Sequence, residues 1–130
     1  MSVAASSQLM VTVPNRAGQL ARVLGVVAQA RVNVLDCAGY AGGAEACILL
    51  VTSNNAKVMT ALRRIGYEVR KDKVVLVTGK DAVGQGARIL KKVADAKINL
   101  RLVHAAGTGR RYLIVLKAAH AHRLAAAVRK

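Results

Sequence analysis

The chain has 130 residues, 54% of them hydrophobic, so it can bury a substantial core as one domain or two small units. It carries 21 Lys and Arg against 6 Asp and Glu, a formal net charge of +15, and it has no Phe or Trp. Residues 1–65 hold six basic and two acidic groups (+4), and residues 66–130 hold fifteen and four (+11). Such a field attracts nucleic acid, anionic ligands or an acidic protein surface without distinguishing among them.

Several classes of protein are disfavoured by the same composition. No apolar run approaches the ~20 residues of a membrane-spanning helix. The first eight residues lack the basic and long apolar regions of a secretory signal, so we expect a cytoplasmic protein. Cys37 and Cys47 are too few for a disulfide framework and lack metal-ligand spacing. His120 and His122 do not share a helix face and have no further ligand nearby, so we expect no metal site.

Hydrophobic periodicity predicts a β-α-β-β-α-β unit in the first half of the chain. Strands are expected over 9–13, 32–40, 45–52 and 67–70, and helices over 19–30 and 55–65. Pro14 ends the first strand, and Asn54 can cap the second helix. Gly66 fits the left-handed end of that helix. Two stripes should face inward: Leu20, Val23, Leu24 and Val27, then Val58, Met59, Leu62 and Ile65.

The second half repeats the first with a shift of 66 residues and no gaps. Residues 84–88 fall on 18–22, residues 97–100 fall on 31–34, and Gly109 falls on Gly43. A self-match at a fixed period is the signature of an internal duplication. We therefore expect two domains, 9–72 and 73–130. The second copy ends inside its second helix without a last strand, and another chain or the N-terminal tail could cover the open edge.

The third strand of each copy is apolar on both faces, over residues 47–51 in the first and 112–116 in the second. An antiparallel sheet with one solvated face would alternate instead. The helix-free face should therefore be buried against the other repeat or a partner subunit, which predicts a homo-oligomer, most simply a dimer.

The stretch over 13–20 offers the chemistry of a small ligand site. Gly18 permits a tight backbone just before a helix, whose first N–H groups, at residues 18–20, favour an anion such as a carboxylate. Asn15 can donate and accept hydrogen bonds beside them. This arrangement suits a zwitterion, although an ordinary strand-to-helix turn would have a similar sequence.

Taken together, these motifs resemble those of an ACT domain. The family has an Asp- or Asn-containing loop with Pro-Gly, then Leu-Ala, and later Gly-Ile-Asn-Ile. Here the first copy reads Asn15-Arg16-Ala17-Gly18-Gln19-Leu20-Ala21 with Val32-Asn33-Val34, and the second reads Asp81-Ala82-Val83-Gly84-Gln85-Gly86-Ala87 with Ile98-Asn99-Leu100. The resemblance runs from Leu9 onward as two tandem copies, like small stand-alone tandem ACT proteins.

The resemblance implies an α+β fold of two tandem ferredoxin-like units, with antiparallel sheets and helices on one face. This sequence departs from the family in four ways, one of which is the missing last strand of the second copy. Ala17 and Val83 stand where Pro is usual, Arg31 and Lys97 stand where Gly is usual, and Gly86 stands where Leu is usual.

The resemblance also implies regulatory binding of a free amino acid, between the first loop of one unit and the second strand of a paired unit. Carried over, the ligand-binding residues are Asn15, Arg16, Ala17, Gly18, Gln19, Leu20, Asn33, Asp81, Val83, Gly84, Gln85 and Asn99. Asp81, being charged, would hold an ammonium more strongly than Asn15. Asn33 and Asn99 could equally be strand-start residues bonded to the backbone.

Catalysis is not expected, and neither is a cofactor. The six carboxylates are scattered, and no Ser or Cys has a recognisable base beside it. Gly-x-Gly at 84–86 is too short for a dinucleotide fingerprint. The alternative to an amino-acid sensor is a basic adaptor that binds an acidic protein or nucleic acid. Only three Tyr are present, which disfavours base-stacking recognition of RNA.

Overall fold

A computed structural model describes residues 1–130, and their contacts divide the chain into two compact units. The first unit is Ser7–Asp72, and the second unit combines Met1–Ser6 with Lys73–Lys130. The elements, in chain order, are β1 (Ser2–Pro14), α1 (Gln19–Gln29), β2 (Val34–Gly42), β3 (Glu45–Thr52), α2 (Asn55–Arg64), β4 (Glu68–Lys80), α3 (Gln85–Asp95), β5 (Leu100–Gly107), β6 (Arg111–Ala118) and α4 (Ala121–Arg129). None of the helices is long and apolar enough to cross a membrane.

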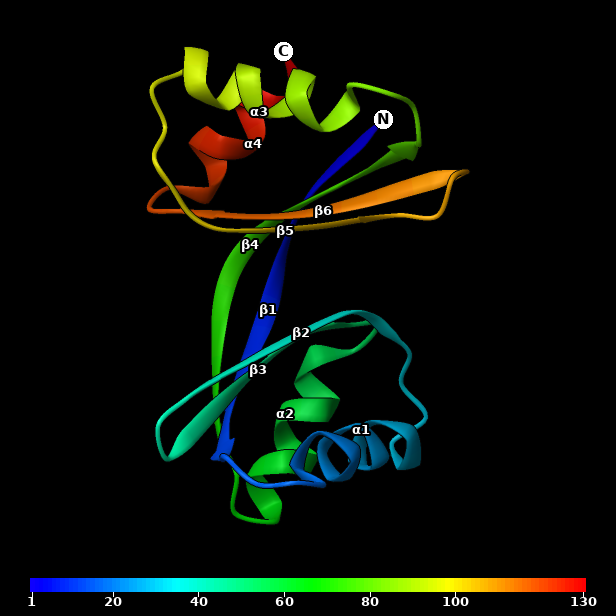
Figure 1. The fold of residues 1–130 in the computed structure, drawn as a ribbon, viewed down its shortest axis with the longest axis vertical. Helices are drawn as coiled ribbons and strands as arrows, with labels where there is room; N and C mark the ends of the chain where they lie inside the picture. The colour runs from blue at the N-terminus through cyan, green and yellow to red at the C-terminus, as the bar shows by residue number, and fades with distance from the viewer. The chain divides into compact units, whose positions relative to one another are not determined.

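The first unit has the ferredoxin-like arrangement predicted from its sequence. Its strands lie in the order β2-β3-β1-β4, and β3 is antiparallel to both β1 and β2. Helices α1 and α2 cover one face of this sheet (Figure 1). Val23 and Val27, one helical turn apart, are buried on α1, as are Val58 and Leu62 on α2. They pack on inward-facing strand residues that include Leu9, Val11, Ile48 and Leu50.

The second unit repeats this plan, with α3 and α4 covering one face of β5 and β6 (Figure 1). Its strand order is β1-β4-β6-β5, and β6 is antiparallel to β4 and β5. As predicted, no strand follows α4. Residues 2–6 of β1 occupy the place of the fourth strand beside β4.

A repeated hydrogen bond shows that these N-terminal residues are equivalent to the fourth strand of the first unit. Arg129 donates from Nη2 to the carbonyl oxygen of Val3 at 3.1 Å, and Arg63 donates in the same way to Val69 at 2.6 Å. Both pairs of equivalent residues obey the 66-residue shift. Val3 also packs against the core of the second unit.

Two strands are therefore much longer than the sequence pattern predicts. A strand was expected over 9–13, but β1 begins at Ser2, and one was expected over 67–70, but β4 continues to Lys80. Each long strand serves as the fourth strand of one unit and then as the first strand of the other. The hydrophobic alternation is interrupted by polar residues at 6–8 and by a charged run at 70–73, so it does not predict that either strand continues.

Two residues predicted to face the core are exposed instead. Leu20 and Ile65 each have 46% of their surface accessible. Leu20 lies in the first turn of α1 and Ile65 caps the last turn of α2, where the helices extend past the well-packed centre of the core. Each of them lines a surface cavity.

Candidate ligand site

The loop before each first helix is anchored to the hairpin turn of its own unit. In the first unit, the backbone N–H of Asn15 donates to Ala44 at 2.9 Å, and its side-chain Nδ2 donates to the carbonyl oxygen of Gly43 at 2.9 Å. In the second unit, the Asp81 N–H donates to Arg110 at 2.8 Å, and Asp81 Oδ2 accepts from the Gly109 N–H at 3.0 Å. The two loops thus use the same contact with opposite polarity.

Helices α1 and α3 both begin at a left-handed glycine, Gly18 with φ 89° and Gly84 with φ 85°. Neither helix has a side-chain cap or an acidic residue in its first turn. The backbone N–H of Gln19 donates a long hydrogen bond to the carbonyl oxygen of Arg16, with 3.5 Å between nitrogen and oxygen. First-turn N–H groups have no intrahelical partner, and the helix dipole favours an anion beside them.

A cavity of about 320 Å³ lies between this loop and the hairpin of the first unit. Four of the predicted ligand residues, Asn15, Arg16, Gln19 and Leu20, line its loop side. The opposite wall comes from β2 and β3, and the full lining is completed by Val13, Pro14, Gly39, Tyr40, Ala41, Ala46, Cys47 and Ile48. A volume near 300 Å³ is at the small end of the range for ligand pockets.

The cavity combines one positive charge, neutral polar groups and an apolar wall, and no carboxylate lines it. Tyr40 and Cys47 lie directly opposite each other on β2 and β3. Electrostatic interaction with Cys47 and a side-chain hydrogen bond between the two residues raise the pKa of Tyr40, with Arg70 acting in the other direction. Tyr40 therefore stays a neutral phenol that can donate a hydrogen bond.

Asn33 and Asn99 do not join these residues within a unit. Asn33 precedes β2, whereas Asn15 is bonded to the turn at the far end of that strand. The nine residues of β2 span roughly 30 Å, beyond the reach of one amino acid. The Asn33 backbone instead exchanges hydrogen bonds with Ser53, at 3.0 Å to its Oγ and 2.9 Å from its N–H. Asn99 has the equivalent place before β5.

The second loop is not a copy of the first in its chemistry. The Asp81 carboxylate is already engaged by the hairpin, and the Val83 side chain is fully exposed. Gln85 accepts a hydrogen bond from Arg88 at 2.9 Å and lines a different cavity. Asp81 and Gln85 are thus held by different neighbours, and the cavity beside Gln85 is not the counterpart of the one beside Asn15.

Sequence reasoning missed the support that Tyr67 gives to the first loop. Its hydroxyl donates to Gln19 Oε1 at 2.9 Å, and the guanidinium of Arg22 lies 5.4 Å from the centre of its ring. These contacts hold the first turn of α1 against the start of β4. Tyr67 and Gln19 are 48 residues apart, and no local pattern signals the pairing.

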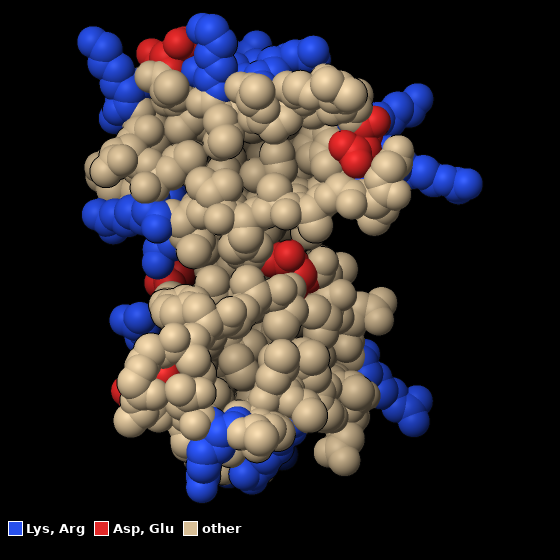
Figure 2. Space-filling view, viewed as in Figure 1, with Lys and Arg blue, Asp and Glu red and all other residues tan.

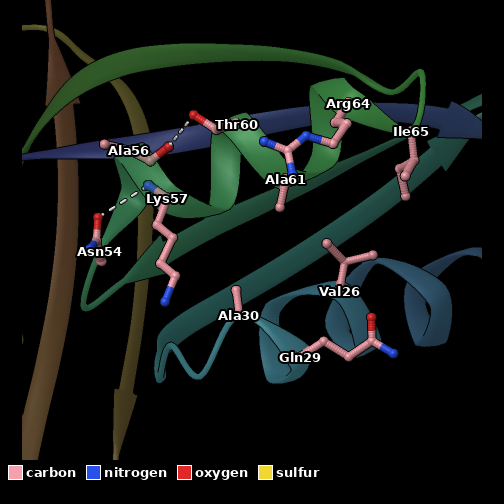
Figure 3. Close-up of a pocket in the computed structure, with 10 residues that line it drawn as sticks. All are labelled: Val26, Gln29, Ala30, Asn54, Ala56, Lys57, Thr60, Ala61, Arg64 and Ile65. Atoms are coloured by element: carbon pink, nitrogen blue, oxygen red, sulfur yellow. Dashed lines mark hydrogen bonds between the residues drawn. The ribbon is translucent and has the colours of Figure 1, made fainter.

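A second, larger cavity of about 770 Å³ runs between α1 and α2 of the first unit. Val26 on α1 faces Ala61 on α2 and Ile65, which caps that helix, across the cavity (Figure 3). Asn54 caps α2 at one end by accepting from the Lys57 N–H at 3.1 Å, as predicted. Neither helix contains an acidic residue, whereas Lys57 and Arg64 lie along the groove.

The equivalent helices of the second unit are bridged by basic side chains. Lys92 donates from Nζ to the carbonyl oxygen of Val128 at 3.3 Å, and Arg123 donates to that of Ala96 at 2.9 Å. Their counterparts in the first unit are Val26 and Lys57. Val26 therefore stands in the first unit at the position from which Lys92 bridges the two helices of the second.

Charge is distributed unequally between the units. The first unit has eight basic and four acidic residues (+4), and the second has thirteen and two (+11). In Figure 2 the basic side chains gather over the end of the second unit that carries α3 and α4. Asp95 there pairs with Lys91 at 2.9 Å.

Comparison with known proteins supports the fold. No family model matches the chain, and no curated protein matches it. Among solved structures, protein BT0572 from Bacteroides thetaiotaomicron has a TM-score of 0.89 at 16% identity, over 98% of this chain and 88% of that one. The ligand-free regulatory subunit of aspartate kinase from Thermus thermophilus has a TM-score of 0.71 at 18% identity, over 98% and 94%.

The fold is that of these regulatory subunits. The corresponding subunit from Thermus flavus is similar too, with a TM-score of 0.62 at 18% identity, over 99% of this chain and 95% of that one. The α+β architecture of ferredoxin-like units predicted from the sequence is thereby confirmed. At these identities the likeness concerns the fold and not the ligand.

Proposed function

We propose that this protein is a regulatory sensor that binds a free amino acid at the loop of the first unit and has no catalytic activity of its own. The observation that carries the proposal is the cavity that joins Asn15, Arg16, Gln19 and Leu20 to the hairpin wall. The proposal is supported by a fold shared with proteins described as regulatory subunits of aspartate kinase.

The available groups suit each part of an amino acid. Arg16 and the first-turn N–H groups of α1 would donate hydrogen bonds to the carboxylate. Ala17 and Gly18 lie between Arg16 and that helix and would border the carboxylate. Because Asn15 Nδ2 is held by Gly43, its Oδ1 is directed elsewhere and would accept from the ammonium. Leu20 and Ile48 would contact the side chain.

The other predicted residues have a lesser place in this proposal. Asn33 and Asn99 would act only from a paired unit in another chain. Asp81, Val83, Gly84 and Gln85 would contribute a second site only if the Asp81 carboxylate left the hairpin, to which Gly109 now binds it.

The test is thermal unfolding with a panel of free amino acids at low and high salt. An amino acid at 100 times its dissociation constant should stabilise the fold by about 2.7 kcal/mol. Leu20→Glu places a carboxylate in the cavity from an exposed position and should abolish the response without unfolding the protein. Ala28→Glu, exposed on the same helix and outside the cavity, is the matched control.

Two results would contradict the sensor. The first is no shift of the unfolding midpoint with any amino acid. The second is an equal response in Leu20→Glu and wild type, which would place the ligand elsewhere.

The groove between α1 and α2 favours a second candidate function, an adaptor for an acidic partner. Its apolar floor and basic residues match an amphipathic helix with acidic flanks. A labelled peptide with Leu at helical spacing and Glu elsewhere should bind wild type in an anisotropy titration. Val26→Lys, which introduces the residue found at the equivalent position 92, should weaken binding, and Ala126→Lys on α4 should not. Equal binding by both variants would show that the net charge attracts the peptide and that the groove does not hold it.

A homodimer remains part of the proposal, on a different basis from that given by the sequence. Leu49 and Val51, on the helix-free face of β3, are already buried in the single chain, so their pattern does not require a partner chain. The outer strand β2 exposes Val34 and Leu35 instead. Sedimentation velocity at micromolar concentration should show a dimer that Leu35→Glu dissociates, and a monomeric wild type would contradict it.

A further inference from the structure

We propose that a cavity at the ends of β4 and β6 in the second unit binds a phosphate group, separately from the amino acid proposed for the first unit. This cavity encloses about 440 Å³. It is lined by Met1, Ser2, Thr78, Gly79, Lys80, Gln85, Arg111 and Tyr112. All of these residues belong to the second unit.

The first observation is a buried hydroxyl without a partner. Tyr112 is 6% exposed, and its Oη makes no hydrogen bond. Its ring lies so close to Gly79 that a Cβ there would be 2.7 Å from Oη. Burying a hydroxyl away from water is costly unless an acceptor receives its hydrogen bond, so this hydroxyl is a donor available to a ligand in the cavity.

The second observation is a pair of like charges. Lys80 and Arg111 lie directly opposite each other on β4 and β6, and neither forms an ion pair. Cross-strand partners of the same charge repel each other. The two carboxylates of this unit are used elsewhere, because Asp81 accepts from Gly109 and Asp95 pairs with Lys91. A bound dianion would relieve the repulsion.

The third observation comes from the corresponding cavity of the first unit, which is charge-balanced. That cavity is lined by Arg16 and Arg22 together with Glu45 and Glu68. By the 66-residue shift, Glu45 becomes Arg111 and Glu68 becomes Ser2. Pro14 becomes Lys80 in the same way. Arg16 becomes Ala82, so each cavity is lined by two cations, but the second copy has lost both acids around this space.

The N-terminus of α3 adds to this field. Gln85 is the first residue of that 11-residue helix and lines the cavity, and no acidic side chain or cap occupies the helix end. Lys80 and Met1 are exposed and can move aside to admit a ligand to Tyr112. Together, two cations, a helix N-terminus and a hydroxyl donor match the charge and oxygen acceptors of inorganic phosphate or a phosphate monoester.

The test uses the full chain and inorganic phosphate, with ionic strength held constant by sodium chloride. The unfolding midpoint of wild type should rise with phosphate and saturate. Tyr112→Phe removes only the unpartnered hydroxyl, so without phosphate it should be at least as stable as wild type, and it should bind phosphate about tenfold more weakly. Arg111→Ala should abolish saturable binding. Arg110→Ala, one residue away and outside the cavity, should keep it.

The two proposals can fail independently. Leu20→Glu should keep the phosphate response, and free amino acids should not compete with phosphate. Equal responses in wild type, Tyr112→Phe and Arg111→Ala would reduce the effect to the net charge and overturn the site. So would the absence of a saturable response in wild type, or a loss of phosphate-free stability in Tyr112→Phe. Glycerol 3-phosphate in place of phosphate would show whether a monoester is accepted.

Discussion

At the scale of single residues, the two copies fill the same cross-strand position with different pairs of side chains. The cross-strand pair is Val13 and Ala46 in the first unit and Gly79 and Tyr112 in the second. A large strand residue faces a small one in both cases, with the sizes exchanged. A Cβ on Gly79 would lie 2.7–2.9 Å from Oη, Cε1 and Cζ of Tyr112, so the ring depends on the glycine.

This exchange predicts strong coupling between the two positions. Gly79→Val should displace the Tyr112 ring, and Tyr112→Ala should leave a cavity that costs about 3–5 kcal/mol. The double variant recreates the pair of the first unit and should recover part of the loss. Chemical denaturation should give a coupling free energy of about 0.5–3 kcal/mol. Additive effects would show that the ring does not rest on Gly79.

A second residue-scale prediction concerns Arg31 and Lys97, which follow α1 and α3 with φ of 58° and 57°. A left-handed backbone costs a residue with a Cβ about 1–2 kcal/mol, and glycine escapes most of that cost. Lys97→Gly should therefore raise the free energy of unfolding by about 0.5–1 kcal/mol after the entropy of glycine is subtracted. Ala96→Gly, at φ −80°, should lower it. A loss in both variants would contradict the argument.

At the scale of elements, β1 and β4 are the elements that both units use. Residues 2–6 belong to the second unit and residues 7–14 to the first, and β4 divides in the same way after Asp72. The side chain of Val3 and the carbonyl oxygen bonded to Arg129 hold the N-terminal residues in place. The second unit therefore depends on a segment that precedes the whole of the first.

Val3→Asp should destabilise the second unit, because it places a carboxylate against the core that Val3 contacts. Ala4→Asp, exposed on the same strand, is the matched control and should change little. Hydrogen exchange at β6 amides should accelerate in the first variant and not in the second. Unchanged protection in Val3→Asp would mean that residues 2–6 do not complete the fold.

The elements with strong local signals were predicted well from the sequence. The β3 bounds of 45–52 are confirmed, because that strand is a continuous apolar run between a glycine turn and a helix cap. The N-terminal tail was one of two alternatives predicted to cover the open edge of the second unit, and residues 2–6 do so. The sequence did not identify them as a strand, because only Val3 among them resembles its mate in the first unit. The loop side of the cavity in the first unit, formed by Asn15, Arg16, Gln19 and Leu20, was predicted from local motifs. Its β2 and β3 wall, and the bond between Tyr67 and Gln19, arise from tertiary contacts that no spacing encodes.

At the scale of the whole molecule, charge and the placement of tyrosines limit what nucleic acid binding can be. The second unit carries thirteen basic residues against two acidic ones, so polyanions are attracted. Tyr112 is buried and the Tyr67 hydroxyl is bonded to Gln19, which leaves Tyr40, at 62% exposed, as the most available ring. A sheet that stacks bases needs two or three such rings.

Any binding to duplex DNA should therefore be independent of sequence and sensitive to salt. Neutralising six to ten phosphates predicts a loss of about 10³–10⁵ in affinity between 50 and 200 mM salt. Anisotropy titrations with two unrelated duplexes should give equal affinities and equal slopes. A preference for one duplex that survives at 200 mM salt would contradict this prediction.

The use of residues 2–6 by the second unit also has a consequence for the order of events during synthesis. The bond between Arg129 and Val3 joins residues 126 positions apart, so Val3 leaves the ribosome well before Arg129 and must wait for it. The first unit needs only residues 7–72 and can form while translation continues. Contacts between residues so far apart in sequence form slowly. Until then the start of β1 is an unpaired strand, exposed to whatever the nascent chain meets.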